Sequence, residues 1–218
     1  MPKLQWDETG EKVYELGTKN MALYVMGANG TYGTGVAWNG ITSVSFNNTG
    51  GDENALWADD MKYGSIRSVE ECGGSIESFT CPREFYPCDG KVEIAKGVAV
   101  GQQNRTPFGF AVKTTIGNDT AGLDFGYKIH IVYNATASPS ERNYTTINDS
   151  PDGQSLSWDY TCTSISVANR KPVSHLEIDS TEADATKLAA LETILFGGVG
   201  ENDNPRLPLP DEIATLMT

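Results

Sequence analysis

The most regular pattern in the chain is an alternation of apolar and polar residues on both sides of a turn, within 107–134. Apolar or aromatic residues occupy nearly every second position over 108–116 and again over 125–133. Successive strand side chains point to opposite faces, so the pattern predicts a hairpin with one apolar face and one mostly polar face. The segment 117–124 between the arms is rich in residues that favour turns. The apolar face needs a second layer to cover it.

Shorter runs of the same kind predict further strands, at 36–46, 55–66, 75–81, 94–101, 156–162 and 173–178. Turn-forming Gly, Asn, Asp and Pro separate them, and 81–90, which is bracketed by prolines, favours a single helical turn. Trp57 and Trp158 fall on apolar positions of their runs and are expected in the core. The chain is therefore predicted to be mostly β, with about eight to ten strands.

One helix is predicted near 182–196, where leucines and alanines form a stripe at helical spacing. Ser180 or Thr181 can cap its start, and Gly197 can end it. Residues 1–35 show one short apolar patch, Met21 to Met26, followed by a glycine-rich segment, and are expected to form an N-terminal arm with little core of its own, which leaves 36–197 as the β domain.

The C-terminal segment 198–218 is predicted to be a second arm, ending in a short helix that begins near Pro210. Its apolar residues would be exposed unless they dock on something. Apolar arms on an acidic β domain favour self-assembly. The candidate contact residues on the two arms are Leu4, Trp6, Leu209, Ile213 and Leu216.

The chain is acidic, with 16 Lys and Arg residues against 29 Asp and Glu residues and a net charge of −13. Tight binding to nucleic acid requires cations that displace counterions from phosphate, so this balance argues against it. The charge fits either simple solubility or a surface that stays near DNA without adhering to it. Asp60, Glu77 and Asp159 alternate with apolar neighbours and are candidates for polar strand positions.

The sequence offers little for catalysis or metal binding. Its four cysteines, at 72, 81, 88 and 162, lack C-x-x-C spacing, and His130 and His175 are its only histidines. Buried free thiols are favoured over a disulfide among the first three cysteines. No G-x-S-x-G motif accompanies a histidine, although a carboxylate pair for glycoside hydrolysis is harder to exclude. We expect no catalytic residue, no cofactor and no metal.

No signal-peptide pattern opens the sequence, and no stretch approaches the length of a membrane span. The expected site of synthesis is therefore the cytoplasm, without membrane association. The seven N-x-[ST] sequons are then attributed to turn-rich composition rather than to glycosylation.

Several segments resemble the major tail proteins of long-tailed bacteriophages, which build the tail tube. They are 38–44 (WNGITSV), 86–90 (YPCDG), 101–109 (GQQNRTPFG), 116–119 (IGND), 126–133 (GYKIHIVY), 137–141 (ASPSE), 146–151 (TINDSP), 179–181 (DST) and 207–212 (LPLPDE). The resemblance covers most of 36–217 in order. No single piece is diagnostic, and the specificity lies in their number and collinearity.

The resemblance implies a tail-tube fold, in which two packed antiparallel sheets form a sandwich or barrel-like body with one flanking helix. Six subunits would join into a ring, and rings would stack into a tube that encloses the tape-measure protein and later conducts DNA. Further partners would be the tail terminator and the distal tail or baseplate proteins. The protein would belong to the virion tail and assemble in the cytoplasm of the host bacterium. The family has no catalytic residues.

On this interpretation Asp60, Glu77 and Asp159 become lumen-facing candidates, and the apolar arm residues become candidates for contacts between rings. The alternatives are another virion β protein, such as a tail terminator or a head decoration protein, and a carbohydrate-binding β-sandwich. The latter would need exposed loop aromatics, for which Tyr32, Phe85 and Tyr86 are the candidates. A glycosidase ranks last.

Overall fold

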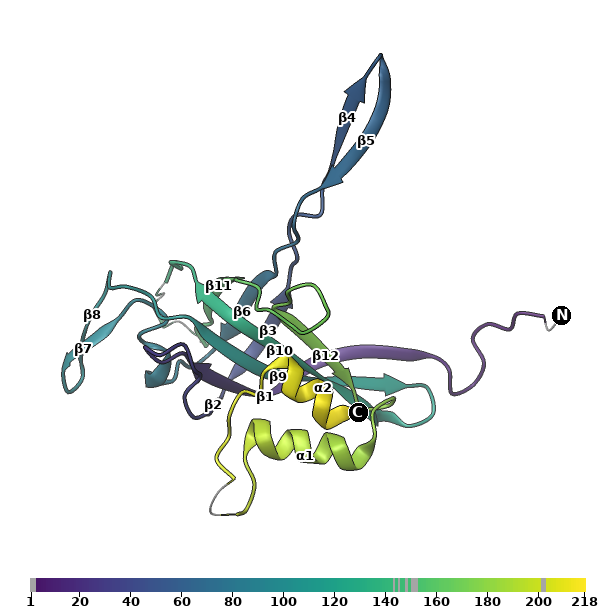
Figure 1. The fold of residues 1–218 in the computed structure, drawn as a ribbon. Helices are drawn as coiled ribbons and strands as arrows, with labels where there is room; N and C mark the ends of the chain where they lie inside the picture. Colours follow the sequence, from purple (N-terminus) through teal and green to yellow (C-terminus); the bar gives the residue numbers. More distant parts are fainter. Residues whose placement is uncertain (1–2, 143, 145, 148, 150–152, 201–202) are drawn as a thin grey trace.

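A computed structural model of the chain describes residues 3–142, 144, 146–147, 149, 153–200 and 203–218. Strands predominate, as the alternating runs predict (Figure 1). The strands are β1 (Val13–Val25), β2 (Val36–Trp38), β3 (Ile41–Phe46), β4 (Glu53–Ala58), β5 (Met61–Arg67), β6 (Gly73–Ser78), β7 (Val92–Ala95), β8 (Val98–Val100), β9 (Phe108–Asn118), β10 (Gly122–Ala137), β11 (Leu156–Cys162) and β12 (His175–Asp179). The helical elements are the 3₁₀ turn η1 (Arg83–Phe85) and the helices α1 (Ala185–Phe196) and α2 (Pro210–Met217).

The main sheet is antiparallel and runs in the order β2-β1-β9-β10-β11-β6-β3, with β12 pairing beside β11 on β10. Its two end strands, β2 and β3, are consecutive in the chain and are joined only by Asn39 and Gly40. Because so short a link holds the ends together, the sheet must curl back on itself. The body is therefore one curled, barrel-like antiparallel sheet. The prediction of an antiparallel, barrel-like β body is confirmed, but its strands form one continuous sheet and not two packed ones.

The inside of this barrel holds the larger apolar core, to which nearly every strand of the main sheet contributes. Its aromatic centre is Trp38, Phe85 and Trp158, whose rings lie 4.5 to 5.4 Å apart. Trp158 is buried, as predicted. The predicted helical turn at 81–90 forms as η1 and places Phe85 in this core.

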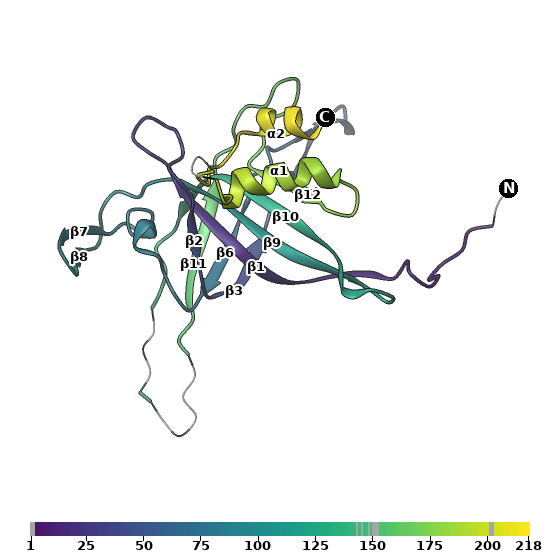
Figure 2. The same cartoon turned by 90° about the horizontal axis from the view of Figure 1, so that it is seen from below.

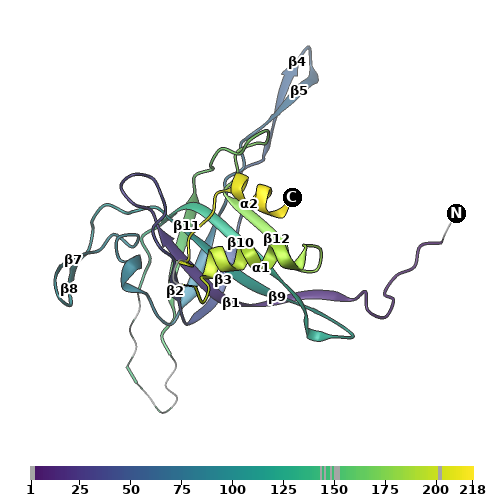
Figure 3. The same ribbon diagram turned by 60° about the horizontal axis from the view of Figure 1, so that its bottom comes forward.

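A second apolar cluster lies outside the barrel, where α1 and α2 cover β9, β10 and β12. Figures 2 and 3 show both helices on the same side of the sheet. The α1 helix is capped by Asp184, whose carboxylate accepts from the N–H groups of Thr186 and Lys187, and not by Ser180 or Thr181. It ends at Gly197, as predicted, in a positive-φ conformation.

The C-terminal segment folds back onto the barrel instead of extending as an arm. Leu207 packs against Gly109 of β9, where an added Cβ would lie 2.4 Å from Leu207 Cδ2. Ile213 is buried in the cluster under the helices, and the hydroxyl of Tyr133 donates to the carbonyl of Pro208 at 2.9 Å. The predicted short helix exists as α2, but its apolar side is already covered within the chain.

The hairpin predicted at 107–134 forms from β9 and β10, but its faces differ from the prediction. The register pairs Phe110 with Val132 and Lys113 with Ile129. Even-numbered residues of both strands therefore share one face, and odd-numbered residues share the other. The apolar set of β9 lies in the barrel core and that of β10 lies under the helices, so both faces are covered.

The N-terminal segment is only partly an arm. Residues 3–12 precede the first strand, and Figure 1 shows them running away from the body. β1 belongs to the main sheet and pairs with β9 along its length, and Met21 to Tyr24 are buried. The predicted boundary at residue 35 does not match the structure, because the short apolar patch at the end of β1 anchors this strand in the core.

Two hairpins stand out from the barrel, β4–β5 and β7–β8 (Figure 1). The run predicted as one strand at 55–66 is the first of these, turning at Asp59 and Asp60, which both have positive φ. Trp57 is 70 % exposed on this hairpin and is not a core residue. The run predicted at 94–101 belongs to the second hairpin.

Candidate functional site

The lumen candidates Glu77 and Asp159 lie close together on the outside of the barrel. They occupy β6 and β11, where the register pairs Glu77 with Ser157 and Asp159 with Ser75. Their neighbours Ile76 and Trp158 point into the core, so the two carboxylates point outward as diagonal neighbours. The third candidate, Asp60, lies in the β4–β5 turn and not on a polar strand position, which corrects that assignment.

The outer face around these carboxylates is polar throughout. On β3, β6 and β11 it presents Ser43, Ser45, Ser75, Glu77, Ser157, Asp159 and Thr161. The hydroxyls of Ser45 and Ser75 are hydrogen-bonded at 2.8 Å. Within the described residues, no helix covers this face, which we call the polar sheet face. Its hydroxyls and carboxylates can hold water and repel anions.

The predicted arm contacts divide into two groups. Leu4 and Trp6 are 72 % and 73 % exposed on the extended N-terminal segment, and Leu209 is also exposed. Ile213 is buried and Leu216 is half-buried in the apolar cluster under α1 and α2, so both side chains are covered at least in part within the chain itself. This corrects their assignment to contacts between subunits.

Sequence reasoning missed the largest group of exposed apolar side chains, which lies on the projecting hairpins. They are Leu56, Trp57, Met61, Tyr63 and Ile66 on β4–β5, and Val92, Ile94, Val98 and Val100 on β7–β8. The Asp59-Asp60 pair between two apolar runs was the signal for the first hairpin. A two-stranded hairpin has no core of its own, so its apolar residues stay exposed on both faces.

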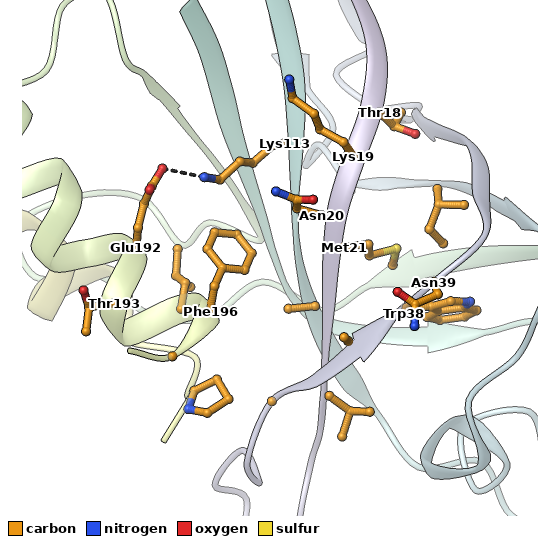
Figure 4. A pocket seen from close by; sticks show the side chains of 18 of the residues that line it. Thr18, Lys19, Asn20, Met21, Trp38, Asn39, Lys113, Glu192, Thr193 and Phe196 are labelled. Atoms are coloured by element: carbon orange, nitrogen blue, oxygen red, sulfur yellow. Dashed lines mark hydrogen bonds and ion pairs between the residues drawn. The ribbon is translucent and has the colours of Figure 1, made fainter. Parts of the chain in front are cut away.

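A hollow of about 710 Å³ lies between the C-terminal half of α1 and the strands β1 and β2 (Figure 4). The most buried charge near it is the ammonium of Lys113, which is paired with Glu192 at 2.6 Å. Asn20 and Lys19 line the other side, where a bulge interrupts the pairing of β1 with β9. This ion pair connects β9 to α1 at the edge of the hollow.

The two histidines, unrelated by any sequence motif, come together between β10 and β12. His130 Nδ1 lies 3.2 Å from His175 Nε2 and 3.8 Å from a carboxylate oxygen of Glu177. Burial lowers the pKa of both imidazoles, which favours their neutral forms. The prediction of no metal rested on the lack of C-x-x-C spacing and on the small number of histidines, and neither observation reports contacts across a sheet.

None of the three loop aromatics considered for carbohydrate binding is fully exposed. Phe85 is fully buried, Tyr86 is half-buried, and Tyr32 is half-buried, with its hydroxyl accepting from the N–H of Asn134. The most exposed aromatic side chains are instead Trp6, Trp57, Tyr63 and Tyr144. Three cysteines are buried, at 72, 88 and 162, in line with the prediction.

None of the helices in the described part of the chain is long and apolar enough to cross a membrane. No protein-family model matches this chain, and no curated protein matches it either.

Proposed function

We propose that this protein is the structural subunit of a bacteriophage tail tube. Subunits join into rings of six, the rings stack, and the resulting tube encloses the tape-measure protein and conducts DNA. The protein has no catalytic role in this proposal. The resemblance of its segments to major tail proteins suggests this function, and the distribution of apolar, polar and unpaired surfaces supports it.

The observation that carries the proposal is the exposed apolar surface of the projecting segments. Trp57 and Tyr63 on the β4–β5 hairpin are 70 % and 81 % exposed, and the N-terminal segment presents Leu4 and Trp6. Isolated apolar residues on a surface are ordinary, but a group of them on a projecting ribbon marks a contact surface. An isolated hairpin is at best marginally stable in water, so a neighbouring subunit that covers it would also stabilise it.

Unpaired sheet edges support lateral assembly. β1 pairs with β9 from Val13 to Val25 but with β2 only over Met21–Leu23. In the part of the chain that the structure describes, no strand pairs with the outer edge of β1 before Met21. An edge of this length attracts another strand, and closure into a ring would remove it from solvent.

The polar sheet face supports passage of DNA without binding. Duplex DNA carries about one negative charge per 1.7 Å of its axis, and Lys and Arg provide most of the affinity of proteins for it. The polar sheet face instead offers Glu77, Asp159 and serine hydroxyls. Such a wall around a channel would repel phosphate and let the duplex slide.

Electron microscopy of the purified protein tests the proposal. Tubes with a central channel are the expected result. The double variant Trp57→Ser/Tyr63→Ser should remain folded by circular dichroism but fail to form tubes, whereas Val199→Ser, which changes an exposed residue after α1, should assemble normally. A protein that stays monomeric at every concentration would contradict the proposal, and isolated rings would favour a tail terminator.

A carbohydrate-binding module is the second candidate, because Trp57 and Tyr63 are exposed aromatics on one hairpin and sugar rings stack on such side chains. Binding to a glycan array that is lost in the same double variant, in protein that forms no tubes, would favour it.

A further inference from the structure

The cluster of His130, His175 and Glu177 is built by the register of two neighbouring strands. His130 on β10 is paired with Glu177 on β12, and Val132 is paired with His175. Paired residues share a face of the sheet, so both imidazoles and the carboxylate project to the same side. Their nearest nitrogen and oxygen atoms all lie within 4.8 Å of one another.

The spacing of these atoms suits a transition metal. Zinc binds histidine nitrogen at about 2.0–2.1 Å with tetrahedral geometry, so two of its ligand atoms lie about 3.3 Å apart. The two histidine nitrogens are 3.2 Å apart, and the Glu177 oxygen is 3.8 Å from His130 Nδ1. We propose that His130, His175 and Glu177 form a Zn²⁺ site, with water as the fourth ligand.

The surroundings hold both imidazoles in place for such an ion. The Phe46 ring stacks on His130 and on His175, with centroids 4.8 and 4.6 Å away. Nε2 of His130 lies 3.1 Å from the hydroxyl of Thr114, whose oxygen can accept a hydrogen bond from Nε2–H and so leave Nδ1 unprotonated for the metal. A partner on the second nitrogen is the usual way in which a protein orients a metal-binding histidine.

The electrostatics and access also agree with zinc. The Glu177 side chain is 54 % exposed, which gives an ion a route from solvent. Lys128, two residues before His130 on β10, is ion-paired with Glu15. Two nitrogen donors disfavour Ca²⁺ and Mg²⁺, which prefer oxygen.

A bound ion would fasten β12 to the sheet. β12 pairs with β10 over only five residues, and it is a side branch of the main strand order. A metal bridging His130 to His175 and Glu177 would join the two strands through their side chains. Zinc binding should therefore raise the thermal stability of the subunit.

The test uses the full chain without a histidine tag, because His130 and His175 are its only histidines. After treatment with EDTA and dialysis, titration with ZnCl₂ in a calorimeter should show one ion bound per chain and a higher melting temperature. Co²⁺ should give the visible bands of a four-coordinate site with nitrogen and oxygen ligands. Failure to bind zinc at micromolar concentrations, or intense thiolate-to-cobalt bands that indicate cysteine ligands, would overturn the proposal.

Substitutions at two proposed ligands and at Thr114 test the composition of the site. Glu177→Gln and His175→Gln should each weaken zinc binding by about 100-fold or more, and Thr114→Val should weaken it by about tenfold, since ligand partners typically contribute that much. Glu182→Gln, at an exposed carboxylate just after β12, is the matched control and should bind like the unchanged protein. Folding is checked by circular dichroism for each variant. Unchanged affinity in folded Glu177→Gln and His175→Gln would show that zinc binds elsewhere.

Discussion

The ammonium of Lys113 lies 2.6 Å from a carboxylate oxygen of Glu192 and connects strand β9 to helix α1 across the face of the sheet. It also lies over the rings of Tyr127 and Phe196, at 4.7 and 5.0 Å from their centroids. Burial, together with the neighbouring Glu192 carboxylate, raises the pKa of Tyr127 to about 12. One cation thus links the helix, the sheet and two aromatic rings.

We predict that breaking this pair destabilises the subunit. The two side chains are only 13 % and 27 % exposed, so either charge left alone would be poorly solvated. Lys113→Met or Glu192→Gln should lower the free energy of unfolding by about 1–2 kcal/mol, between the values for exposed and fully buried pairs. Urea unfolding measures this change.

The control for this prediction is the Lys62–Glu53 pair on the β4–β5 hairpin, whose side chains are 48 % and 41 % exposed. Lys62→Met should lower the free energy of unfolding by less than about 1 kcal/mol, because exposed ion pairs contribute no more than that to stability. Equal effects at the two pairs would show that burial does not strengthen the Lys113 contact.

A second prediction concerns the C-terminal helix. Ile213 is 5 % exposed under the helices, whereas Leu209, four residues earlier, is 55 % exposed. Ile213→Ala should destabilise the unassembled subunit by about 2–4 kcal/mol, because it leaves a cavity in a packed cluster. Leu209→Ala should change stability by less than about 1 kcal/mol. If Ile213→Ala impaired only assembly and left unfolding unchanged, the segment would be an arm after all.

The alternation of apolar and polar residues predicted most of the strands, because this two-residue period can be recognised within each short run of sequence. It could not predict the faces of the β9–β10 hairpin, since these depend on the register. Pairing of Phe110 with Val132 puts the two apolar sets on opposite sides of the sheet. A register change of one residue would have put them on the same side, and a turn of eight residues does not fix that choice.

Tertiary packing determines how the N-terminal and C-terminal segments fold, and the local sequence pattern did not predict it. β1 is mostly exposed before Met21 and is held there by backbone pairing with β9, which hydropathy does not report. The C-terminal segment looked like an exposed arm because its cover, the sheet face that contains Gly109 and Ile131, is assembled from distant residues. The candidate sites are likewise assembled from residues that are distant in the sequence. Glu77 meets Asp159, and His130 meets Glu177, only across strand pairs.

A third prediction tests the polar sheet face as the wall of a channel. Glu77→Lys/Asp159→Lys should leave folding and tube formation intact, because both side chains point outward from the barrel. The variant tubes should retain linear duplex DNA at low salt in a filter-binding assay, and the retention should weaken steeply as salt is raised. Unchanged tubes should retain none.

Asp60→Lys is the matched control for this charge reversal. It adds a lysine at the β4–β5 turn, away from the polar sheet face, and should not cause retention of DNA by the channel. DNA retention as strong in Asp60→Lys as in the double variant would contradict the assignment of Glu77 and Asp159. In a phage that carries the double variant, DNA ejection should be impaired.

The last prediction concerns two cysteines that face each other across neighbouring strands. The N–H of Cys162 donates to the carbonyl of Cys72 at 2.8 Å, next to the pairing of Gly73 with Thr161. A hydrogen bond from the Cys162 thiol lowers the pKa of Cys72 to about 7, although burial opposes this, and Ser174 adds a second hydrogen bond. Burial raises the pKa of Cys81 to about 11 and that of Cys88 to about 12.

Since the thiolate is the reactive form, mild oxidation with diamide should join Cys72 to Cys162 and leave Cys81 and Cys88 reduced. The two thiols lose two protons and two electrons, which pass to the azo group of diamide. The rate should rise with pH up to about 7 and then level off, because Cys72 is ionised above its pKa, whereas an ordinary thiol of pKa about 8.5 would keep accelerating. Tandem mass spectrometry of unreduced peptides identifies the bond, and Cys162→Ser should abolish it. A bond between Cys81 and Cys88 that forms first would contradict the proposed order of reactivity.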